Sequence, residues 1–171
     1  MTARPIGVAI AGLGFGEKVH LPALQANADL TPVALWHPRP ARLEQACATH
    51  GLPGHSDWGA LLADPAVEAI VIATPPAPRH ELARQALLAG KHLLLEKPVA
   101  LQADQARDLQ RLAMERQLSV AVNYEYRAVP LFIQAERLLR AGAVGTPWLV
   151  KLDWLMSSRA DASRGWNWYS Q

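Results

Sequence analysis

The chain has 171 residues, enough for one domain or for one domain and part of another. Half of the residues are hydrophobic and 19% are charged, so the chain can bury a substantial core. A net charge of +2 without a basic run argues against a nucleic-acid-binding protein. No apolar stretch reaches membrane-spanning length, and the first residues lack the apolar core of a signal peptide. The single cysteine, Cys47, excludes an internal disulfide and is typical of a reducing compartment, so we expect a cytoplasmic protein.

The first predicted elements are a strand, a glycine-rich turn and a helix. Residues 6–11 form a short apolar run, which is typical of a strand buried on both faces. The turn covers residues 12–16, and a helix is predicted over residues 17–28. This order is suited to a nucleotide pyrophosphate, because Gly12 allows a tight turn, Gly14 lets a phosphate approach the backbone, and the helix start offers free N–H groups.

The glycine motif departs from the full dinucleotide-binding pattern at its third position. Glu17 stands where a third glycine is expected, and Gly16 is the alternative small residue. A glycine turn without any ligand is the competing interpretation. Because the turn follows the first strand and opens a helix, we expect Gly12, Gly14, Phe15 and Gly16 to contact a nucleotide.

Further along the chain, predicted strands alternate with predicted helices. The strands are expected at residues 30–36, 67–73, 92–95 and 118–122, and the helices at residues 41–50, 57–62, 79–89 and 102–116. This alternation predicts an α/β fold with a Rossmann-type, doubly wound parallel sheet covered by helices on both faces. Ligands of such sheets bind beyond the carboxyl ends of the strands, where residues 12–16, 36–39, 74–76 and 96–98 are expected.

The last part of the chain does not continue this alternation. A helix is predicted over residues 131–141, and a partly alternating antiparallel strand over residues 148–156. We therefore assign residues 1–125 to a dinucleotide-binding domain and residues 126–171 to the opening helix and strand of an incomplete α/β second domain. A strand without a neighbour invites self-pairing, so we also expect a homo-oligomer.

The end of the second predicted strand indicates which dinucleotide is bound. An acid at this position would hydrogen-bond the ribose 2′-hydroxyl and favour NAD. This chain has Trp36 and His37 there, with Arg39 and Arg42 close behind. A basic cluster suits the additional phosphate, so we expect NADP, with NAD as the alternative. Both arginines could instead be solvated residues of the following helix.

Glu96, Lys97 and Pro98 put a lysine at a strand end, near the expected nicotinamide. A lysine at this place can donate a proton or polarise a carbonyl oxygen as a hydride moves. The alternative is an ordinary surface lysine, which is the commonest environment for this residue type.

Several motifs together resemble those of the Gfo/Idh/MocA oxidoreductase family, over essentially the whole chain. They are Gly12-x-Gly14 with residues 19–22, then residues 72–76, and residues 90–98, of which the last is the most specific. The resemblance implies a Rossmann domain followed by an α/β domain built on a large antiparallel sheet. It also implies hydride transfer between NAD(P) and a sugar, inositol or related polyhydroxy or carbonyl substrate, with Lys97 as the catalytic residue.

The resemblance completes the candidate site. The candidate cofactor-binding residues are Gly12, Gly14, Phe15, Gly16, Trp36, His37, Arg39, Thr74, Pro75, Glu96 and Asn123. The candidate substrate-binding residues are Lys97, Tyr124 and Arg127. A family histidine falls on Arg79, next to His80, and neither is carried over. The family's second-domain Asp…His pair is expected beyond residue 171, so we expect this chain to bind cofactor but to turn over little.

The histidines have no ligand spacing, so no metal is expected. A protein of another class remains as the alternative function: a non-catalytic nucleotide-binding module or a regulatory subunit.

Overall fold

The computed structural model describes residues 4–153 and 155. The chain divides after Asn123 into two compact units, residues 1–123 and 124–171. This division lies two residues before the predicted boundary at residue 125.

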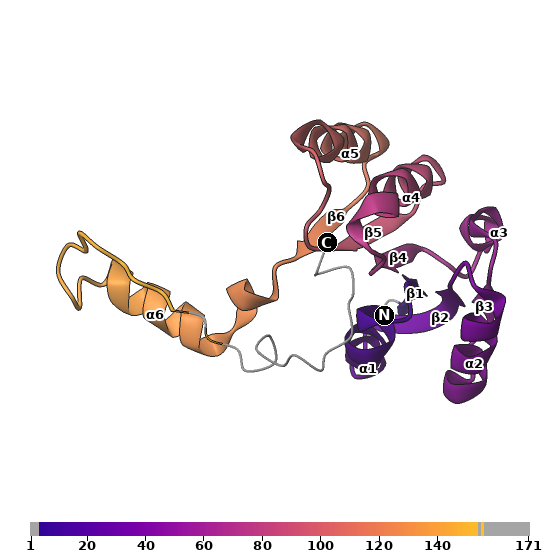
Figure 1. The fold of residues 1–171 in the computed structure, drawn as a ribbon, viewed down its shortest axis with the longest axis horizontal. Helices are drawn as coiled ribbons and strands as arrows, with labels where there is room; N and C mark the ends of the chain where they lie inside the picture. Colours follow the sequence, from indigo (N-terminus) through magenta and orange to yellow (C-terminus); the bar gives the residue numbers. More distant parts are fainter. Residues whose placement is uncertain (1–3, 154, 156–171) are drawn as a thin grey trace. The chain divides into compact units, whose positions relative to one another are not determined.

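The first unit is built on one sheet of six parallel strands (Figure 1). The strands are β1 (Ile6–Ala11), β2 (Leu30–Trp36), β3 (Gly54–His55), β4 (Ala69–Ile72), β5 (His92–Glu96) and β6 (Val120–Asn123). Their order is β3-β2-β1-β4-β5-β6, so the chain runs outward from β1 in one direction and then outward from β4 in the other. This order confirms the predicted doubly wound sheet, and its reversal between β1 and β4 is the place where such sheets bind ligands.

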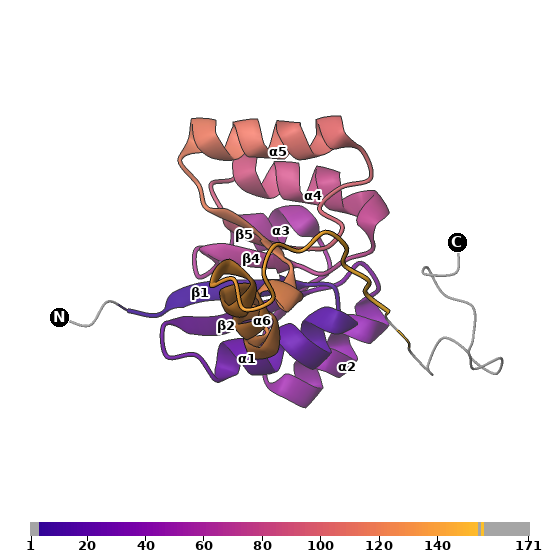
Figure 2. The same cartoon turned by 90° about the vertical axis from the view of Figure 1, so that its left-hand side faces the viewer.

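Helices cover both faces of the sheet, as Figures 1 and 2 show. The helical elements of this unit are η1 (Gly16–His20), α1 (Leu21–Gln25), α2 (Pro40–His50), α3 (Trp58–Ala63), α4 (Pro76–Leu88) and α5 (Ala103–Arg116). One hydrophobic core joins the sheet to α1 and α2 through residues such as Ile10, Leu21 and Leu43. The other core joins the opposite face to α3, α4 and α5 through residues such as Ile72 and Leu109.

Local signals explain most of the helix ends. Asp57 caps α3 by accepting a hydrogen bond from the Ala60 N–H at 2.7 Å. Gly51 ends α2 in the left-handed conformation, with φ of 65°. The prediction for α4 is wrong by three residues, because this helix begins at Pro76 rather than Arg79. A proline fits the first turn of a helix, where its missing N–H would have no partner in any case.

The helix predicted over residues 17–28 is also partly wrong. It consists of a wide π-helical turn, η1, followed by the short helix α1, which ends at Gln25. The two-residue strand β3 was not predicted, because two residues show no periodicity.

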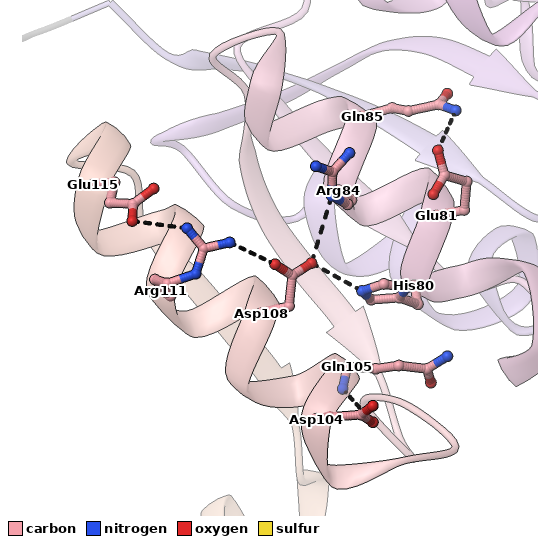
Figure 3. Close-up of polar contacts among 9 residues, drawn as sticks. All are labelled: His80, Glu81, Arg84, Gln85, Asp104, Gln105, Asp108, Arg111 and Glu115. Carbon is pink, nitrogen blue, oxygen red and sulfur yellow. Dashed lines mark hydrogen bonds and ion pairs between the residues drawn. The ribbon is translucent and has the colours of Figure 1, made fainter.

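A network of polar side chains joins α4 to α5, which pack on the same face of the sheet (Figure 3). The Asp108 carboxylate of α5 accepts hydrogen bonds from His80 Nε2 at 3.1 Å and Arg111 Nη2 at 2.8 Å, and pairs with Arg84 Nε at 3.5 Å. The hydrogen bond from His80, followed by that from Arg111, lowers the pKa of Asp108 although partial burial opposes the shift. This network crosses between two helices, so it supports the packing of the α4–α5 layer.

The second unit begins with the short 3-10 helix η2 (Glu125–Ala128) and continues with α6 (Pro130–Arg140). The helix α6 confirms the predicted helix over residues 131–141. The strand predicted over residues 148–156 is wrong for the part that the structure describes, since residues 148–153 and 155 have no strand conformation. A strand needs a hydrogen-bonded neighbour, and none is provided in the described part of this unit. Residues 154 and 156–171, and with them Trp154 and Met156 of the predicted strand, lie outside the described residues.

Within residues 4–153, no helix is long and apolar enough to cross a membrane.

Candidate functional site

The glycine turn between β1 and η1 is shaped by contacts with the end of β4. An ideal Cβ on Gly12 would lie 2.7 Å from the Ala73 carbonyl group, and Gly12 has φ of +103°, so only glycine fits there. A Cβ on Gly16 would lie 2.8 Å from Ile10 Cγ2. Gly16 therefore provides the close helix–strand approach that the motif assigns to its third glycine. A Cβ on Gly14 would meet no atom within 4 Å, which leaves the turn open at this point.

Glu17, which replaces that third glycine, faces the helix α2. Its carboxylate accepts a hydrogen bond from His50 Nε2 at 3.0 Å and forms a hydrogen-bonded ion pair with Arg42. Burial alone would raise the pKa of Glu17, but the bonds from His50 and Arg42 outweigh it and hold the pKa below its usual value. Arg42 also donates to the Leu13 carbonyl oxygen at 3.0 Å, so it is bound to the glycine turn.

The end of β2 places a neutral histidine beside positive charge. Burial lowers the pKa of His37, and the charges of Arg39 and Arg42 lower it further. His37 Nδ1 also accepts a hydrogen bond from the Arg39 backbone N–H at 3.1 Å. The Arg39 side chain has no hydrogen bond or ion pair with the part of the chain that the structure describes. It is therefore available to an anion.

Trp36, at the end of β2, lies in the core. Its ring is 7% exposed and packs edge-on against Trp58, with ring centroids 5.0 Å apart. Both indole N–H groups are buried, and neither has a hydrogen-bond partner among the described residues. A buried donor without a partner costs free energy, so these two groups are an unfavourable feature of the core.

The loop after β4 carries a second kind of unsatisfied group. Thr74 is 6% exposed, and its Oγ1 has no partner in the described residues. Its backbone nitrogen lies 2.9 Å from the Cβ position of Gly12, so the hydroxyl-bearing residue directly adjoins the glycine turn. Pro75, which follows it, precedes the first turn of α4. A hydroxyl group without a partner at the carboxyl ends of the strands is suited to form a hydrogen bond with a bound nucleotide.

Arg79, set aside by the sequence analysis, organises the loops around the candidate catalytic lysine. It is 2% exposed, and its guanidinium donates to three backbone carbonyls, those of Thr74, Glu96 and Pro98. The bond to the Glu96 carbonyl is 2.6 Å long. Arg79 therefore ties the loop after β4 to both residues that flank Lys97.

The Glu96 side chain is held as tightly as its backbone. Its carboxylate accepts from His20 Nε2 at 2.8 Å, from Asn123 Nδ2 at 2.6 Å and from the Lys97 N–H at 3.3 Å. These contacts join η1, β5 and β6 at one edge of the sheet, with Glu96 only 7% exposed. His20 also packs edge-on against Phe15 of the glycine turn, with ring centroids 5.4 Å apart.

Lys97 differs from its neighbours. Its side chain is half-buried, and its Nζ makes no hydrogen bond or ion pair with any residue that the structure describes. The peptide bond to Pro98 is cis. A free amine on a fixed backbone can reach a ligand at the carboxyl edge of the sheet.

The structure thus gathers most of the candidate cofactor residues of the first unit at the predicted edge. Tyr124 and Arg127 belong to the second unit, where the Arg127 N–H donates to the Tyr124 carbonyl at 2.9 Å. Their contact with a substrate stays a prediction. His20 and Arg79 are the residues that sequence reasoning missed, because their partners are distant in the chain and carry no local signal.

In the described part, no group of three or more His, Cys, Asp or Glu side chains could hold a metal ion.

Comparison with known proteins places this site in a family. Residues 6–124 match the model of the oxidoreductase family with an NAD-binding Rossmann fold, GFO_IDH_MocA. An uncharacterized oxidoreductase of Synechocystis sp. is 41% identical over 173 residues, which cover 100% of this chain and 47% of the relative. An inositol 2-dehydrogenase/D-chiro-inositol 3-dehydrogenase of Lactiplantibacillus plantarum is 32% identical over 148 residues, covering 82% of this chain and 41% of the relative.

A solved structure shows the same relation. The 3-ketoreductase KijD10 from Actinomadura kijaniata, in complex with NADP and TDP-benzene, superposes with a TM-score of 0.77 at 30% identity. The match covers 81% of this chain and 43% of the ketoreductase. The chain belongs to the Gfo/Idh/MocA family of NAD(P)-binding oxidoreductases, and it spans less than half the length of these curated relatives.

Proposed function

We propose that this chain forms the cofactor-binding part of an oxidoreductase that prefers NADP and acts on a sugar, an inositol or a related small polyhydroxy or carbonyl compound. The observation that carries the proposal is the carboxyl edge of the sheet between β1 and β5. There an open glycine turn, an orphaned buried Thr74 hydroxyl and a free Lys97 amine lie on neighbouring elements. The relatives' names support the substrate class.

The residues present suit the cofactor. The open turn at Gly14 and the start of η1 would hold the pyrophosphate with backbone N–H groups. Arg39, with its side chain free, would meet the 2′-phosphate beside the neutral His37. Thr74 Oγ1 would supply a hydrogen bond on the other side of the turn. When bound, NADP supplies or accepts the hydride.

We assign the proton transfer to Lys97. When a carbonyl is reduced, the Lys97 ammonium donates a proton to the oxygen as a hydride arrives at carbon, and in the oxidation direction the neutral amine takes the hydroxyl proton back. Glu96 and Arg79 keep the backbone of this residue in place, the first through its carboxylate and the second through the carbonyls on both sides of Lys97. The reacting amine is thus presented on a rigid loop, which favours a short proton path.

A titration with NADPH and NADH, followed by tryptophan fluorescence with Trp36 as the expected reporter, tests the cofactor. We expect NADPH to bind more tightly than NADH. Tighter NADH binding would overturn the NADP preference, and no binding of either would overturn the proposal.

Turnover of a panel of inositols and sugars, measured by NADPH formation, tests the role of Lys97. Lys97→Arg is the matched variant, since it keeps the charge but cannot give up its proton at neutral pH. We expect it to bind NADPH within about threefold of the unchanged chain and to lose about a hundredfold or more of any turnover. Equal turnover in both would contradict the catalytic role.

A further inference from the structure

His20, the last residue of η1, is a buried histidine that has no role in the proposed function. Its side chain is 9% exposed, and it ends the π-helical turn that follows the glycine turn. In this turn the Leu21 N–H donates to the Gly16 carbonyl, which makes the turn wider than one of an α-helix. Such turns are rare and frequently occur at functional sites. The side chain at the end of this turn is therefore a candidate for a functional contact.

The imidazole of His20 links two elements that the sheet itself keeps apart. Its Nε2 donates to the Glu96 carboxylate at 2.8 Å, and the two side chains are only 9% and 8% exposed. An ionised carboxylate only accepts hydrogen bonds, so the hydrogen lies on Nε2. The strand β1 leads into η1 and β5 ends at Glu96, and β4 lies between these two strands in the sheet. The bond thus connects η1 directly to the end of β5.

The other partners of Glu96 belong to its own side of the sheet. Asn123 Nδ2 of β6 donates to the same carboxylate oxygen at 2.6 Å, and the Lys97 N–H donates to the second oxygen at 3.3 Å. Asn123 lies opposite Glu96 in the pairing of β5 with β6. Of these three donors, His20 alone comes from the element that follows the glycine turn. Without His20, the Glu96 carboxylate would be held from β5 and β6 but not from η1.

The position of the His20 ring is itself restrained. Phe15 of the glycine turn packs edge-on against it, with ring centroids 5.4 Å apart and an interplanar angle of 75°. This edge-to-face arrangement is a favourable one for aromatic rings. A continuous series of contacts therefore runs from Phe15 through His20 and Glu96 to the backbone N–H of Lys97.

Reduction of a carbonyl needs two groups at a fixed separation. In the proposed function the cofactor is held at the glycine turn and η1, whereas the proton is carried by Lys97 after β5. The hydride and the proton go to adjacent atoms of one carbonyl, and a displacement of about 1 Å can cost about a hundredfold in rate. A buried, charge-assisted hydrogen bond between η1 and the residue before Lys97 meets this need.

We propose that His20 is a positioning residue, which holds η1 and the bound cofactor at a fixed distance from Lys97 through its hydrogen bond to Glu96. The inference rests on the proposed function, in which NADP binds at η1 and Lys97 transfers the proton. His20 itself exchanges neither the hydride nor the proton. Arg79 holds the backbone on both sides of Lys97 from the loop after β4, and His20 adds the connection to the cofactor-binding element.

The contact between the cofactor and Lys97 is measurable without turnover. Acetic anhydride acetylates free amines, and mass spectrometry of the digested chain gives the rate at Lys97 relative to that at Lys151, whose side chain is 80% exposed. In the unchanged chain, saturating NADPH should slow acetylation of Lys97 by about tenfold or more, because the form with an uncovered amine becomes scarce. Each variant is measured at saturation of its own NADPH titration, so a change in affinity does not enter the comparison.

His20→Asn and His20→Gln form a matched pair. The glutamine amide nitrogen stands close to the place of Nε2, whereas the shorter asparagine amide does not reach Glu96. His20→Asn should keep the Kd of NADPH within about fivefold but reduce the protection of Lys97 to about threefold or less, because the cofactor stays at η1 while Lys97 is no longer held against it. His20→Gln should restore the protection to within about twofold of that in the unchanged chain.

His80→Asn is the control for the loss of a histidine–carboxylate contact. His80 Nε2 makes the same type of bond to Asp108 at 3.1 Å, but between α4 and α5. This variant should change neither the Kd of NADPH nor the protection of Lys97. Full protection in His20→Asn, an equal loss in His80→Asn, or no recovery in His20→Gln would overturn the role of His20.

Circular dichroism shows whether each variant folds. If His20→Asn does not fold, Glu96→Gln replaces it, because the amide keeps the size of the side chain and weakens the bond from His20; the protection of Lys97 must still fall. The two proposals fail differently. No protection by NADPH in the unchanged chain would reject the proposed role of Lys97 and this inference with it, whereas protection that persists in these variants would reject the inference alone.

Discussion

The glycine turn contains three glycines that are required for different physical reasons, and alanine substitutions distinguish these reasons. At Gly14 an added Cβ would touch no atom within 4 Å, and the residue is not among the glycines with positive φ. Gly14→Ala should therefore leave the fold intact and raise the free energy of unfolding by about 0.4–1 kcal/mol, because alanine restricts the unfolded chain. The same methyl group would occupy space that a phosphate needs, so NADPH binding should weaken by about tenfold or more.

At Gly12 the expected balance is the reverse. An added Cβ would lie 2.7 Å from backbone atoms of Ala73, and the residue has φ of +103°. Neither the strand end nor the dihedral can relax cheaply, so Gly12→Ala should lower the free energy of unfolding by about 3 kcal/mol or more. Gly16→Ala should be intermediate, at about 1–3 kcal/mol, because its contacts are the side chains of Ile10 and Ala73, at 2.8 Å and 3.2 Å.

Urea unfolding followed by circular dichroism gives the stabilities, and fluorescence titration gives the NADPH affinity of each variant. The expected order of stability is Gly14→Ala, then the unchanged chain, then Gly16→Ala, then Gly12→Ala. The reasoning would be refuted if Gly14→Ala lost as much stability as Gly12→Ala, or if it bound NADPH as tightly as the unchanged chain.

Two further predictions concern polar side chains outside the turn. Arg79→Met should lower the free energy of unfolding by about 3 kcal/mol, because it leaves three backbone carbonyls without their buried donor; urea unfolding measures this, and a loss below about 1 kcal/mol would contradict it. Asp108→Asn should lower the melting temperature at neutral pH, where the carboxylate accepts from His80 and Arg111. The pKa of Asp108 is lowered in the folded chain, so this stabilisation is complete above about pH 4 and is lost as the pH falls through the folded pKa. The difference in melting temperature between the two proteins should therefore vanish in acid, and a constant difference across the pH range would count against this network.

The errors in predicting the elements have physical causes. The helix predicted from residue 79 begins earlier, at Pro76, because proline is suited to the first turn of a helix. The short strand β3 exists because its two residues pair with Leu35 and Trp36 of β2, which no local pattern reveals. A strand was predicted over residues 148–156 from an alternating pattern, but its described residues have no strand conformation. An alternating pattern is local, whereas a strand also requires a hydrogen-bonded partner.

In the first unit, the sequence by itself determined the order of the helices and of every strand except β3, and therefore which segments lie at the carboxyl ends of these strands. Apolar periodicity and the local conformational needs of glycine, proline and capping residues act within a few positions of each other, so they can be read directly. This was enough to predict the parallel sheet, the open glycine turn and the place of Lys97.

Only the tertiary structure decided which polar groups meet. His20 and Glu96 are 76 positions apart, and Glu17 and Arg42 are 25 positions apart, yet each pair forms a hydrogen-bonded contact. Arg79 likewise finds its carbonyl partners in the loop after β4 and at the end of β5. Such contacts depend on strand register and on how helices pack across the sheet, because a polar side chain that is removed from water must bind whatever partner the fold brings within reach.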